Sequence, residues 1–597
     1  MHHPLLNIHD LRIDFDVVPQ RVTAVQNMNL QVNRGEIVAI VGESGSGKSV
    51  TALSILRLLP SPPAVYASGS ILFSPDGNTT VDLLTIPDDE LRTIRGNGIA
   101  MIFQEPMTSL NPVLTCGDQV MEAIMLHQKI SRSEATDKTL RLFGKVQLPD
   151  PDTLFNRYPH QLSGGQKQRV MIAMAMSCEP ALLICDEPTT ALDVTVQKTI
   201  LTLIKELQQT EQMGVIFITH DLGVVAEIAD RALVMYKGEI VEAGPVHEIF
   251  RSPRHPYTRG LLMCRPALHP RGSRLPVVAD FLTVDSALSS IRSNQNETAV
   301  RPHEVPAGTL VQDNDRVLPF TGNVVSKVKP GLKEAAGRQV LMRVTDLDVW
   351  FPLKRNLFGK PKSFLKAVDN VSFDVYAGET LGLVGESGCG KTTLGRTLLG
   401  LIKPVSGTIE YKNRDIASLT EKEMRFMRQQ LQIVFQDPYS SLNPRMTIGA
   451  AIAEPLRLLT KRDRKAKVID LLEKVNLKPE HYGRYPHEFS GGQRQRIVIA
   501  RALAMGPSFL VCDESVSALD VSVQAQVLNL LNELKKEFRL TVVFISHDLG
   551  VVRFLSDRIM VMNQGKIVES GDAETVYRQP RTEYTRRLVA SIPGLPA

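Results

Sequence analysis

The sequence predicts an α/β fold of two tandem units, each built on a mainly parallel β-sheet. The first observation is an ordered set of motifs that occurs twice in the 597 residues. The second is that strand-like runs such as EIVAIV and GVIFITH alternate with helical stretches such as SVTALSILRLL, which is typical of a parallel sheet covered by helices. The third is a glycine-rich turn in each unit, placed between an apolar strand run and an apolar helix.

The repeat is defined by the spacing of its motifs. GESGSGK, which ends at Lys48, recurs as GESGCGK, which ends at Lys391, an offset of 343 residues (391 minus 48). The offset is 332 residues between Gln104 and Gln436, and 327 residues for the three motifs that follow. The first unit therefore carries 11 additional residues before Gln104, and we expect them in the hairpin ILFSPDGNTTVDLL. Five motifs repeated in the same order indicate a duplicated domain.

Between the two units the repeat is lost. Residues 265–338 are rich in Pro, Ser, Asn and Arg and show no sustained period, which predicts a partly flexible connector on the surface, with room for a short helix at 286–293. We assign residues 5–264 to the first half of the chain and residues 339–597 to the second half.

Composition and charge exclude several classes of protein. The 69 basic and 64 acidic residues give a net charge of +5 that is spread along the chain, so no nucleic-acid partner is required. The six cysteines include no CxxC pair, which favours apolar fillers in a reducing cytosol over a zinc site or a disulfide framework. No signal peptide is evident, and the apolar runs are far shorter than the ~20 residues that span a bilayer. Any membrane attachment is therefore expected through partner subunits.

The glycine-rich turns fit the pattern G-x-x-x-x-G-K-[ST], the phosphate loop. Glycines let backbone N–H groups surround the phosphates of ATP, the lysine neutralises them, and the final hydroxyl helps to hold Mg²⁺. The predicted ATP-binding residues of the two loops are Gly42, Glu43, Ser44, Gly45, Ser46, Gly47, Lys48 and Ser49, and Gly385, Glu386, Ser387, Gly388, Cys389, Gly390, Lys391, Thr392 and Thr393.

Two carboxylates end an apolar strand run in each half. ALLICDE places Asp186 and Glu187 at the carboxyl edge of the sheet, and FLVCDE does the same for Asp513 and Glu514. The aspartates are predicted to bind Mg²⁺ through water. The glutamates are predicted to polarise the water that attacks the γ-phosphate, which makes them catalytic residues.

A histidine and a glutamine complete the set in each half. His220 and His547 each end a strand run 33 residues after the glutamate, and the identical spacing favours a catalytic γ-phosphate contact over a structural histidine. Gln104 and Gln436 follow strand runs and can contact both the water and the metal. The predicted metal-binding residues are Ser49, Gln104, Asp186, Thr392, Gln436 and Asp513.

The sequences LSGGQ and FSGGQ predict a second kind of phosphate contact. Each serine is expected to cap a helix, and the two glycines that follow would allow a phosphate to approach the helix N-terminus. Because this helix lies far from the phosphate loop in sequence, the anion could come from a partner. The residues are Ser163, Gly164, Gly165 and Gln166, and Ser490, Gly491, Gly492 and Gln493.

Taken together, these motifs resemble the nucleotide-binding domains of ATP-binding cassette transporters over nearly the whole chain outside the connector. The resemblance implies two P-loop cassettes, each with a helical subdomain, that pair head to tail within the chain. One composite site would join Lys48 and its partners to Ser490, and the other would join Lys391 and its partners to Ser163. Neither half lacks a catalytic residue, so both sites are expected to hydrolyse ATP.

Finer features resemble the branch that imports dipeptides, oligopeptides, glutathione and nickel. EPMTSLNP and DPYSSLNP after the glutamines, and HPYTRGLL at 255–262, are typical of it. The second half departs from the pattern at Glu583, where a proline is expected, and the connector lacks the cysteine cluster of an iron–sulfur centre. Phe15 and Phe364 are candidates for stacking on adenine.

The resemblance also implies partners and a location. They are two integral-membrane permeases and, indirectly, an extracytoplasmic substrate-binding protein, with the chain peripheral on the cytoplasmic face of the inner membrane. The resemblance favours the import of peptides, and the import of nickel or another small solute is the alternative. A soluble tandem-cassette translation factor is the rival from another class, but such proteins typically carry a long charged helical linker, and a DNA-repair cassette ATPase would need a coiled coil or zinc hook.

Overall fold

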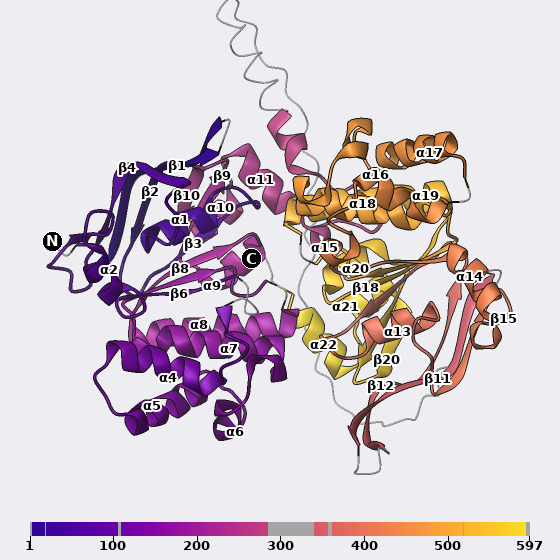
Figure 1. Cartoon of the computed structure of the whole chain (residues 1–597), viewed down its shortest axis with the longest axis horizontal. Coiled ribbons are helices and arrows are strands. Elements are labelled where there is room, and N and C mark those ends of the chain that lie inside the picture. The colour runs from indigo at the N-terminus through magenta and orange to yellow at the C-terminus, as the bar shows by residue number, and fades with distance from the viewer. Residues whose placement is uncertain are drawn as a thin grey trace, which may run out of the picture.

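A computed structural model describes residues 3–17, 20–104, 109–190, 192–283, 339–355, 361–457, 459–517 and 519–592. The two halves lie side by side, and each contains a six-stranded sheet, a four-stranded sheet and a group of helices (Figure 1). The α/β prediction of two cassettes with mainly parallel sheets is confirmed.

The six-stranded sheet forms the centre of each half. Its order is β10-β9-β3-β8-β7-β6 in the first half and β16-β17-β18-β13-β19-β20 in the second, and all neighbours run parallel except the β9–β10 and β19–β20 pairs. The strands of the first sheet are β3 (Ile37–Val41), β6 (Ile99–Ile102), β7 (Leu182–Asp186), β8 (Gly214–Thr219), β9 (Arg231–Tyr236) and β10 (Glu239–Pro245). Those of the second are β13 (Thr380–Val384), β16 (Leu431–Val434), β17 (Phe509–Asp513), β18 (Thr541–Ser546), β19 (Arg558–Asn563) and β20 (Lys566–Asp572). Every residue of β3, β7 and β8 is buried, as expected for strands that are covered on both faces.

Each half also contains a four-stranded antiparallel sheet, with the order β2-β1-β4-β5 or β12-β11-β14-β15. The strands are β1 (Leu6–Val17), β2 (Gln20–Val32), β4 (Ala64–Phe73) and β5 (Val81–Asp82), and β11 (Val340–Arg355), β12 (Pro361–Tyr376), β14 (Ser406–Tyr411) and β15 (Arg414–Asp415). The β4–β5 turn spans residues 74–80, whereas the β14–β15 turn spans only 412–413. This hairpin therefore holds only part of the 11 additional residues, and the remainder lies outside the turn.

Helices cover the central sheets and form a separate helical part in each half. The first half contains α1 (Lys48–Ile55), α2 (Asp88–Ile94), α4 (Cys116–His127), α5 (Arg132–Lys145), α6 (Pro151–Phe155), α7 (Gly164–Ala175), α8 (Val194–Glu211), α9 (Leu222–Ile228), α10 (Val246–Arg251) and α11 (Pro256–Met263). The second contains α13 (Lys391–Leu398), α14 (Glu421–Gln430), α15 (Pro438–Ser441), α16 (Ile448–Ala453), α17 (Lys461–Lys474), α18 (Gly491–Leu503), α19 (Val521–Phe538), α20 (Leu549–Leu555), α21 (Ala573–Arg578) and α22 (Glu583–Ala590). The group α4 to α7 lies at the bottom of Figure 1 and the group α16 to α18 at the top, so the halves point in opposite directions.

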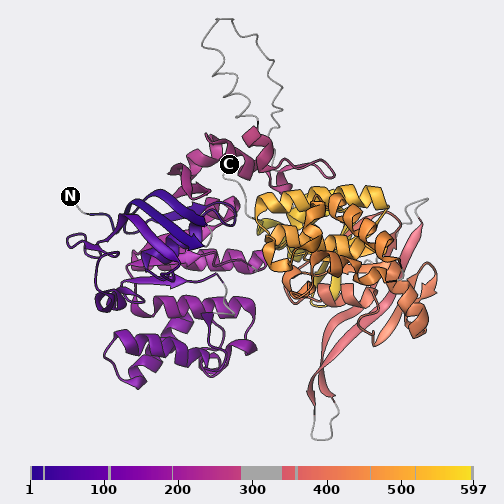
Figure 2. The same cartoon turned by 45° about the horizontal axis from the view of Figure 1, so that its top comes forward.

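Residues 265–283, the docking segment, pack against the second half. Leu275 is fully buried, its N–H donates to Asn529 Oδ1 (2.8 Å), and Asn529 Nδ2 donates back to its carbonyl (2.9 Å). Arg553 donates to the carbonyl of Ala267 (3.1 Å), and Arg271 lies 3.0 Å from Asp557. Figure 2 shows this magenta segment against the second half. The connector thus begins with a folded part, while the helix expected at 286–293 lies outside the described residues.

Candidate functional site

Each phosphate loop turns between a buried strand and the start of a helix, as the sequence predicts. Lys48 Nζ donates to the carbonyls of Gly42 (2.8 Å) and Glu43 (2.9 Å), and Lys391 makes the same contacts with the second loop. Gly47 has a φ of 102° and lies so close to the carbonyl of Ala24 that a Cβ would sit 2.6 Å from it, so this position requires glycine. The loop therefore holds the lysine against its own backbone. Burial lowers the pKa of Lys48, although neighbouring carboxylates oppose the shift.

The predicted metal-binding hydroxyl and carboxylate meet in both halves. Ser49 Oγ donates to Asp186 (3.0 Å), and Thr392 Oγ1 donates to Asp513 (2.9 Å). Burial raises the pKa of Asp186 to about 6, since the hydrogen bond from Ser49 offsets only part of the loss of solvation. A hydroxyl and a carboxylate beside a phosphate loop are hard oxygen ligands of the kind that Mg²⁺ prefers, so the donor set fits this ion.

Glu187, the predicted catalytic glutamate, is the centre of a hydrogen-bonded group in the first half. One oxygen of Glu187, Oε2, lies 3.0 Å from Gln104 Nε2, 3.0 Å from Thr190 Oγ1 and 3.3 Å from His220 Nδ1. Burial alone would raise the pKa of Glu187, but the hydrogen bond and charge of His220 outweigh it and lower the pKa to about 2. The same pair raises the pKa of His220 despite its burial. Glutamate, glutamine and histidine thus converge on one point, where a water molecule could be oriented.

The second half repeats this group, with a shorter contact to the glutamine and a longer contact to the histidine. Glu514 Oε2 accepts from Gln436 Nε2 at 2.8 Å and lies 3.7 Å from His547 Nδ1. Burial would raise the pKa of Glu514, but His547 and Lys391 lower it below its usual range. Glu187 and Glu514 both have a φ of 46°, an uncommon backbone conformation for a residue other than glycine. The turn after each strand is therefore constrained in the same way.

Ser163 of LSGGQ and Ser490 of FSGGQ, the signature serines, cap helices, as the sequence predicts. Ser163 Oγ accepts from the N–H of Gln166 (3.3 Å), and Ser490 Oγ accepts from the N–H of Gln493 (3.4 Å). Each glutamine side chain accepts in return from the serine N–H, at 3.0 and 3.1 Å. Among the described residues no hydrogen bond joins either serine to the opposite phosphate loop, so the composite sites remain a prediction.

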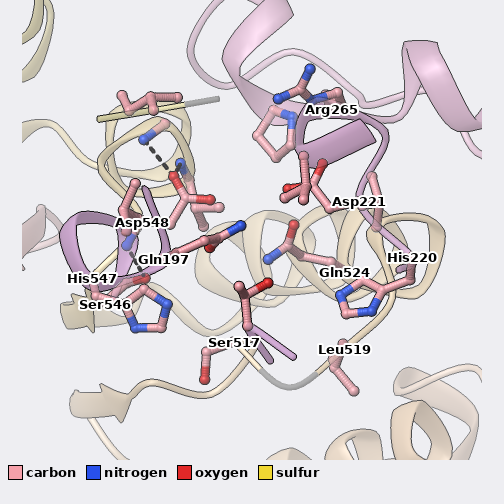
Figure 3. A pocket seen from close by; sticks show the side chains of 18 of the residues that line it. Gln197, His220, Asp221, Arg265, Ser517, Leu519, Gln524, Ser546, His547 and Asp548 are labelled. Carbon is pink, nitrogen blue, oxygen red and sulfur yellow. Dashed lines mark hydrogen bonds between the residues drawn. The ribbon is translucent and has the colours of Figure 1, made fainter. Parts of the chain in front are cut away.

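A small cavity of about 140 Å³ lies where the halves meet. His220, Asp221 and Gln197 of the first half, and His547, Asp548 and Gln524 of the second, all line it (Figure 3). The carboxylate of Asp520, at the start of α19, accepts a hydrogen bond from the N–H of Ser44 (3.0 Å). The second half therefore contacts the phosphate loop of the first half directly.

The adenine candidate of the second half, Phe364, stays a prediction and is absent from the lining of the cavity beside the second phosphate loop. A cavity of about 510 Å³ beside the second phosphate loop is lined by Lys391, Gln436, Glu514 and Phe351, and Phe364 is not among its lining residues. The ring of Phe364 lies 6.2 Å from that of Trp350 instead. The signal for Phe351 is present in the sequence, because DLRIDF ends at Phe15 and DLDVWF ends at Phe351.

Sequence reasoning also missed the role of a tyrosine in each C-terminal region. Tyr257 and Tyr584 accept hydrogen bonds from the phosphate loops, from Glu43 N–H (2.9 Å) and Glu386 N–H (3.0 Å). HPYT and TEYT mark both tyrosines, but the sequence gives no sign that they lie beside loops about 200 residues away.

Comparisons with known proteins agree with this geometry. Residues 25–190 and 368–517 match the family described as ABC transporter, and residues 241–281 and 568–597 match the oligopeptide/dipeptide transporter C-terminal region. The chain is 48% identical over 593 residues to the glutathione import ATP-binding protein GsiA of Salmonella choleraesuis, covering 99% of this chain and 89% of the relative. It is 47% identical over 592 residues to the Escherichia coli protein of the same name, with the same coverage.

Among solved structures, a dimeric ATP-binding cassette in a post-hydrolysis state with ADP and Pi is 29% identical, with a TM-score of 0.36, and covers 40% of this chain and 98% of its own. The matches to the family cover both halves, and both halves contain the residues that the sequence predicts for binding and hydrolysing ATP. The chain therefore belongs to the ABC transporter family and is an ATPase with two cassettes.

Proposed function

We propose that this chain is the ATPase of an importer for small peptides, with glutathione as the first substrate to test. The two matches to the oligopeptide/dipeptide transporter region carry this proposal, because that region occurs once in each half. Relatives that share 46–48% identity over nearly the whole chain are named glutathione import ATP-binding proteins, which supports the choice of glutathione. The same region contains Tyr257 and Tyr584, whose hydroxyls accept hydrogen bonds from the phosphate loops.

Each residue of the site has a separate role in the hydrolysis of ATP. Lys48 and the loop N–H groups bind the phosphates, Ser49 and Asp186 would hold Mg²⁺, and Glu187 would orient and deprotonate the attacking water. Mg²⁺, when bound, neutralises charge on the phosphate oxygens. His220, already hydrogen-bonded to Glu187, is placed to donate to the γ-phosphate. The equivalent residues of the second half would do the same.

Each site is proposed to be completed by the signature serine of the other half. The opposite orientation of the two helical groups supports this head-to-tail pairing, and so does the contact of Asp520 with Ser44. A helix N-terminus capped by Ser163 or Ser490 would add partial positive charge to the γ-phosphate when the halves close.

The surface beside Gln436 is proposed to hold a short helix of a membrane permease. Asp437 accepts from the N–H groups of Tyr439 (2.8 Å) and Ser440 (3.2 Å), which fixes the single turn of α15. The side chain of Tyr439 is 65% exposed, and the guanidinium of Arg494 lies 3.8 Å from its ring. The matching residues 105–108 of the first half lie outside the described residues. This turn therefore links a site glutamine to an exposed aromatic ring.

No described helix is long and apolar enough to cross a bilayer. We propose that the chain is held at the cytoplasmic face of the membrane by two permeases, and that an extracytoplasmic binding protein delivers the substrate. Proteoliposomes that contain the chain, its co-purified permeases and internal ATP should accumulate labelled glutathione or a dipeptide when the binding protein is added. Accumulation of nickel alone would replace the peptide substrate, and co-purification with ribosomes instead of permeases would overturn the proposal.

A further inference from the structure

A tyrosine from the C-terminal region anchors the start of each phosphate loop. The hydroxyl of Tyr257 accepts from the N–H of Glu43 at 2.9 Å, and the hydroxyl of Tyr584 accepts from the N–H of Glu386 at 3.0 Å. Tyr257 is fully buried, so the N–H that it satisfies is shielded from water on that side. The same contact therefore occurs in both halves, although the surrounding sequences differ.

A carboxylate fixes the helix that carries each tyrosine. Glu242 accepts from the N–H groups of Arg254 (2.8 Å) and His255 (3.1 Å), just before α11 begins. In the second half, Glu569 accepts from the N–H groups of Arg581 (2.9 Å) and Thr582 (3.1 Å), just before α22. The carboxylates thus hold the helix starts at equivalent places.

The replacement of proline by Glu583 leaves the contact of Tyr584 with its loop intact. Thr582 caps α22 by accepting from the N–H of Thr585 (3.2 Å), whereas His255 caps α11 through its ring nitrogen. Two different caps therefore produce the same tyrosine position, which indicates that the tyrosine is the feature the two halves share.

The same two helices reach the opposite half at their other ends. The docking segment follows α11 and binds α19 through Leu275 and Asn529, at 2.8 and 2.9 Å. The carbonyl of Ala590, the last residue of α22, accepts from Lys198 Nζ of α8 (3.0 Å). In the first half, α11 and the docking segment after it therefore connect the phosphate loop to a helix of the second half. In the second half, α22 alone connects the phosphate loop to a helix of the first half.

We propose that Tyr257 and Tyr584 are positioning residues for ATP binding, and that α11 and α22 link the relative position of the two halves to the shape of the phosphate loops. The inference rests on the phosphate loops binding ATP. Glu43 and Ser44 donate consecutive N–H groups to Tyr257 and to Asp520 of the second half. The entry of this loop is thus held from both halves before nucleotide arrives. Burial raises the pKa of both tyrosines, so their hydroxyls stay neutral and keep their hydrogen-bonding capacity.

The test measures ATP binding at one site at a time. In the Lys391→Ala background, ATP is titrated in the presence of Mg²⁺ and its affinity for the Lys48 site is measured by calorimetry. Adding Tyr257→Phe should weaken ATP binding about tenfold, because a buried N–H loses its acceptor and the loop is no longer preorganised. Tyr584→Phe should do the same for the other site in the Lys48→Ala background, which provides an independent test.

Tyr236→Phe is the matched control. The ring of Tyr236 lies 4.3 Å from the ring of Tyr257. Its substitution therefore removes a hydroxyl from the same aromatic pair but leaves the hydrogen bond between Tyr257 and Glu43 in place. It should leave the affinity of the Lys48 site unchanged, and thermal unfolding without nucleotide should be measured for every variant.

Three results would overturn the inference. If Tyr257→Phe lowered the unfolding temperature but left the affinity for ATP unchanged, the tyrosine would be structural only. An equal loss of affinity with Tyr236→Phe would also contradict it. Absence of ATP binding in the Lys391→Ala parent itself would instead reject the nucleotide site, and the inference with it.

Discussion

Asp520 of the second half accepts a hydrogen bond from the backbone N–H of Ser44 in the phosphate loop of the first half, at 3.0 Å. Its counterpart Asp193 instead accepts from the N–H of Val196 (2.9 Å) and caps its own helix α8. The α19 helix has no side-chain cap from Asp520 as a result. The two sites therefore differ in nucleotide-free contacts although their motifs are the same.

This asymmetry predicts different effects for two matched substitutions. Asp520→Ala should weaken ATP binding at the Lys48 site about fivefold, since about 1 kcal/mol of hydrogen bonding to the loop is lost. Asp193→Ala should mainly lower the stability of the chain, by about 1 kcal/mol for a lost helix cap. ATP titration and thermal unfolding of both variants would check this, and identical profiles would contradict the asymmetry.

Replacing both glutamates that we propose as catalytic should trap nucleotide. Glu187→Gln with Glu514→Gln keeps the shape of the side chains but removes the base, so ATP turnover should fall by roughly 100-fold or more while ATP still binds. Retention of labelled nucleotide after gel filtration, beside a steady-state ATPase assay, would measure both effects. Turnover at the parent rate would show that the glutamates do not have the assigned role.

The two sites are expected to depend on each other. Lys48→Ala and Lys391→Ala should each reduce ATP turnover by far more than half, because closure of either site would require both halves. ATPase assays of the two single variants against the parent chain give the measurement. Independent sites would leave about half of the activity in each variant.

The exposed ring of Tyr439 predicts where energy passes to the membrane partner. Tyr439→Asp should abolish permease binding or uncouple import while ATP hydrolysis by the isolated chain persists, because the ring is 65% exposed and makes no hydrogen bond with the catalytic glutamate. The matching test in the first half is at Met107, outside the described residues. Uptake at the parent rate in cells that carry both substitutions would exclude this surface.

Glu569 predicts a pH-dependent contribution to stability. Burial would raise its pKa, but the N–H groups of Arg581 and Thr582 lower it below its ordinary value of 4.5. A depressed pKa means that the stabilisation is complete above pH 4.5 and is lost as the pH falls through the folded-state pKa. Glu569→Gln should therefore be less stable than the parent at pH 7, by about 1 kcal/mol, with a smaller difference below pH 4.5.

Thermal unfolding of parent and Glu569→Gln at pH 7 and pH 4 would check this prediction. Glu242→Gln is the corresponding variant of the first half, where the pKa of the carboxyl is lowered by the same kind of backbone contacts. A difference in unfolding temperature that does not change with pH would show that the charge of the carboxylate is not what matters.

The sequence was sufficient to predict that the proposed catalytic residues lie together, because they follow buried strands of one parallel sheet. Asp186 ends β7, Glu187 follows it, and His220 follows β8; because β7 and β8 pair side by side, these motifs had to meet at one edge. The residue–residue contacts of Glu187 with Gln104 and His220 agree with that expectation.

The lining of the cavity beside the second phosphate loop could not be predicted as well, because it depends on how β11 and β12 pair. In the β11–β12 ladder, Phe351 pairs with Leu365, and both line the cavity. Phe364 is one residue away from Leu365 along the strand and does not line the cavity, although Lys366 and Ala367, on the other side of Leu365, do. A single step along β12 therefore separates a lining residue from a ring that packs on Trp350.

The contacts between α11, α22 and the phosphate loops depend on long-range packing that has no local pattern. Tyr257 is 214 residues from Glu43, and the partners Leu275 and Asn529 are 254 residues apart. Neither the hydrophobic periodicity nor the turn residues of the sequence specify such pairs, so these contacts can be seen only in the structure.

The docking segment has a consequence for how the two cassettes find each other. Because Leu275 is buried against the second half within the same polypeptide, pairing occurs at the effective concentration set by the chain and does not depend on how much protein the cell makes. Self-pairing of identical cassettes is then disfavoured, and each assembly contains one of each. Because both halves belong to one chain, the two sites are free of the symmetry of a homodimer, and their phosphate loops differ at Ser46 and Cys389.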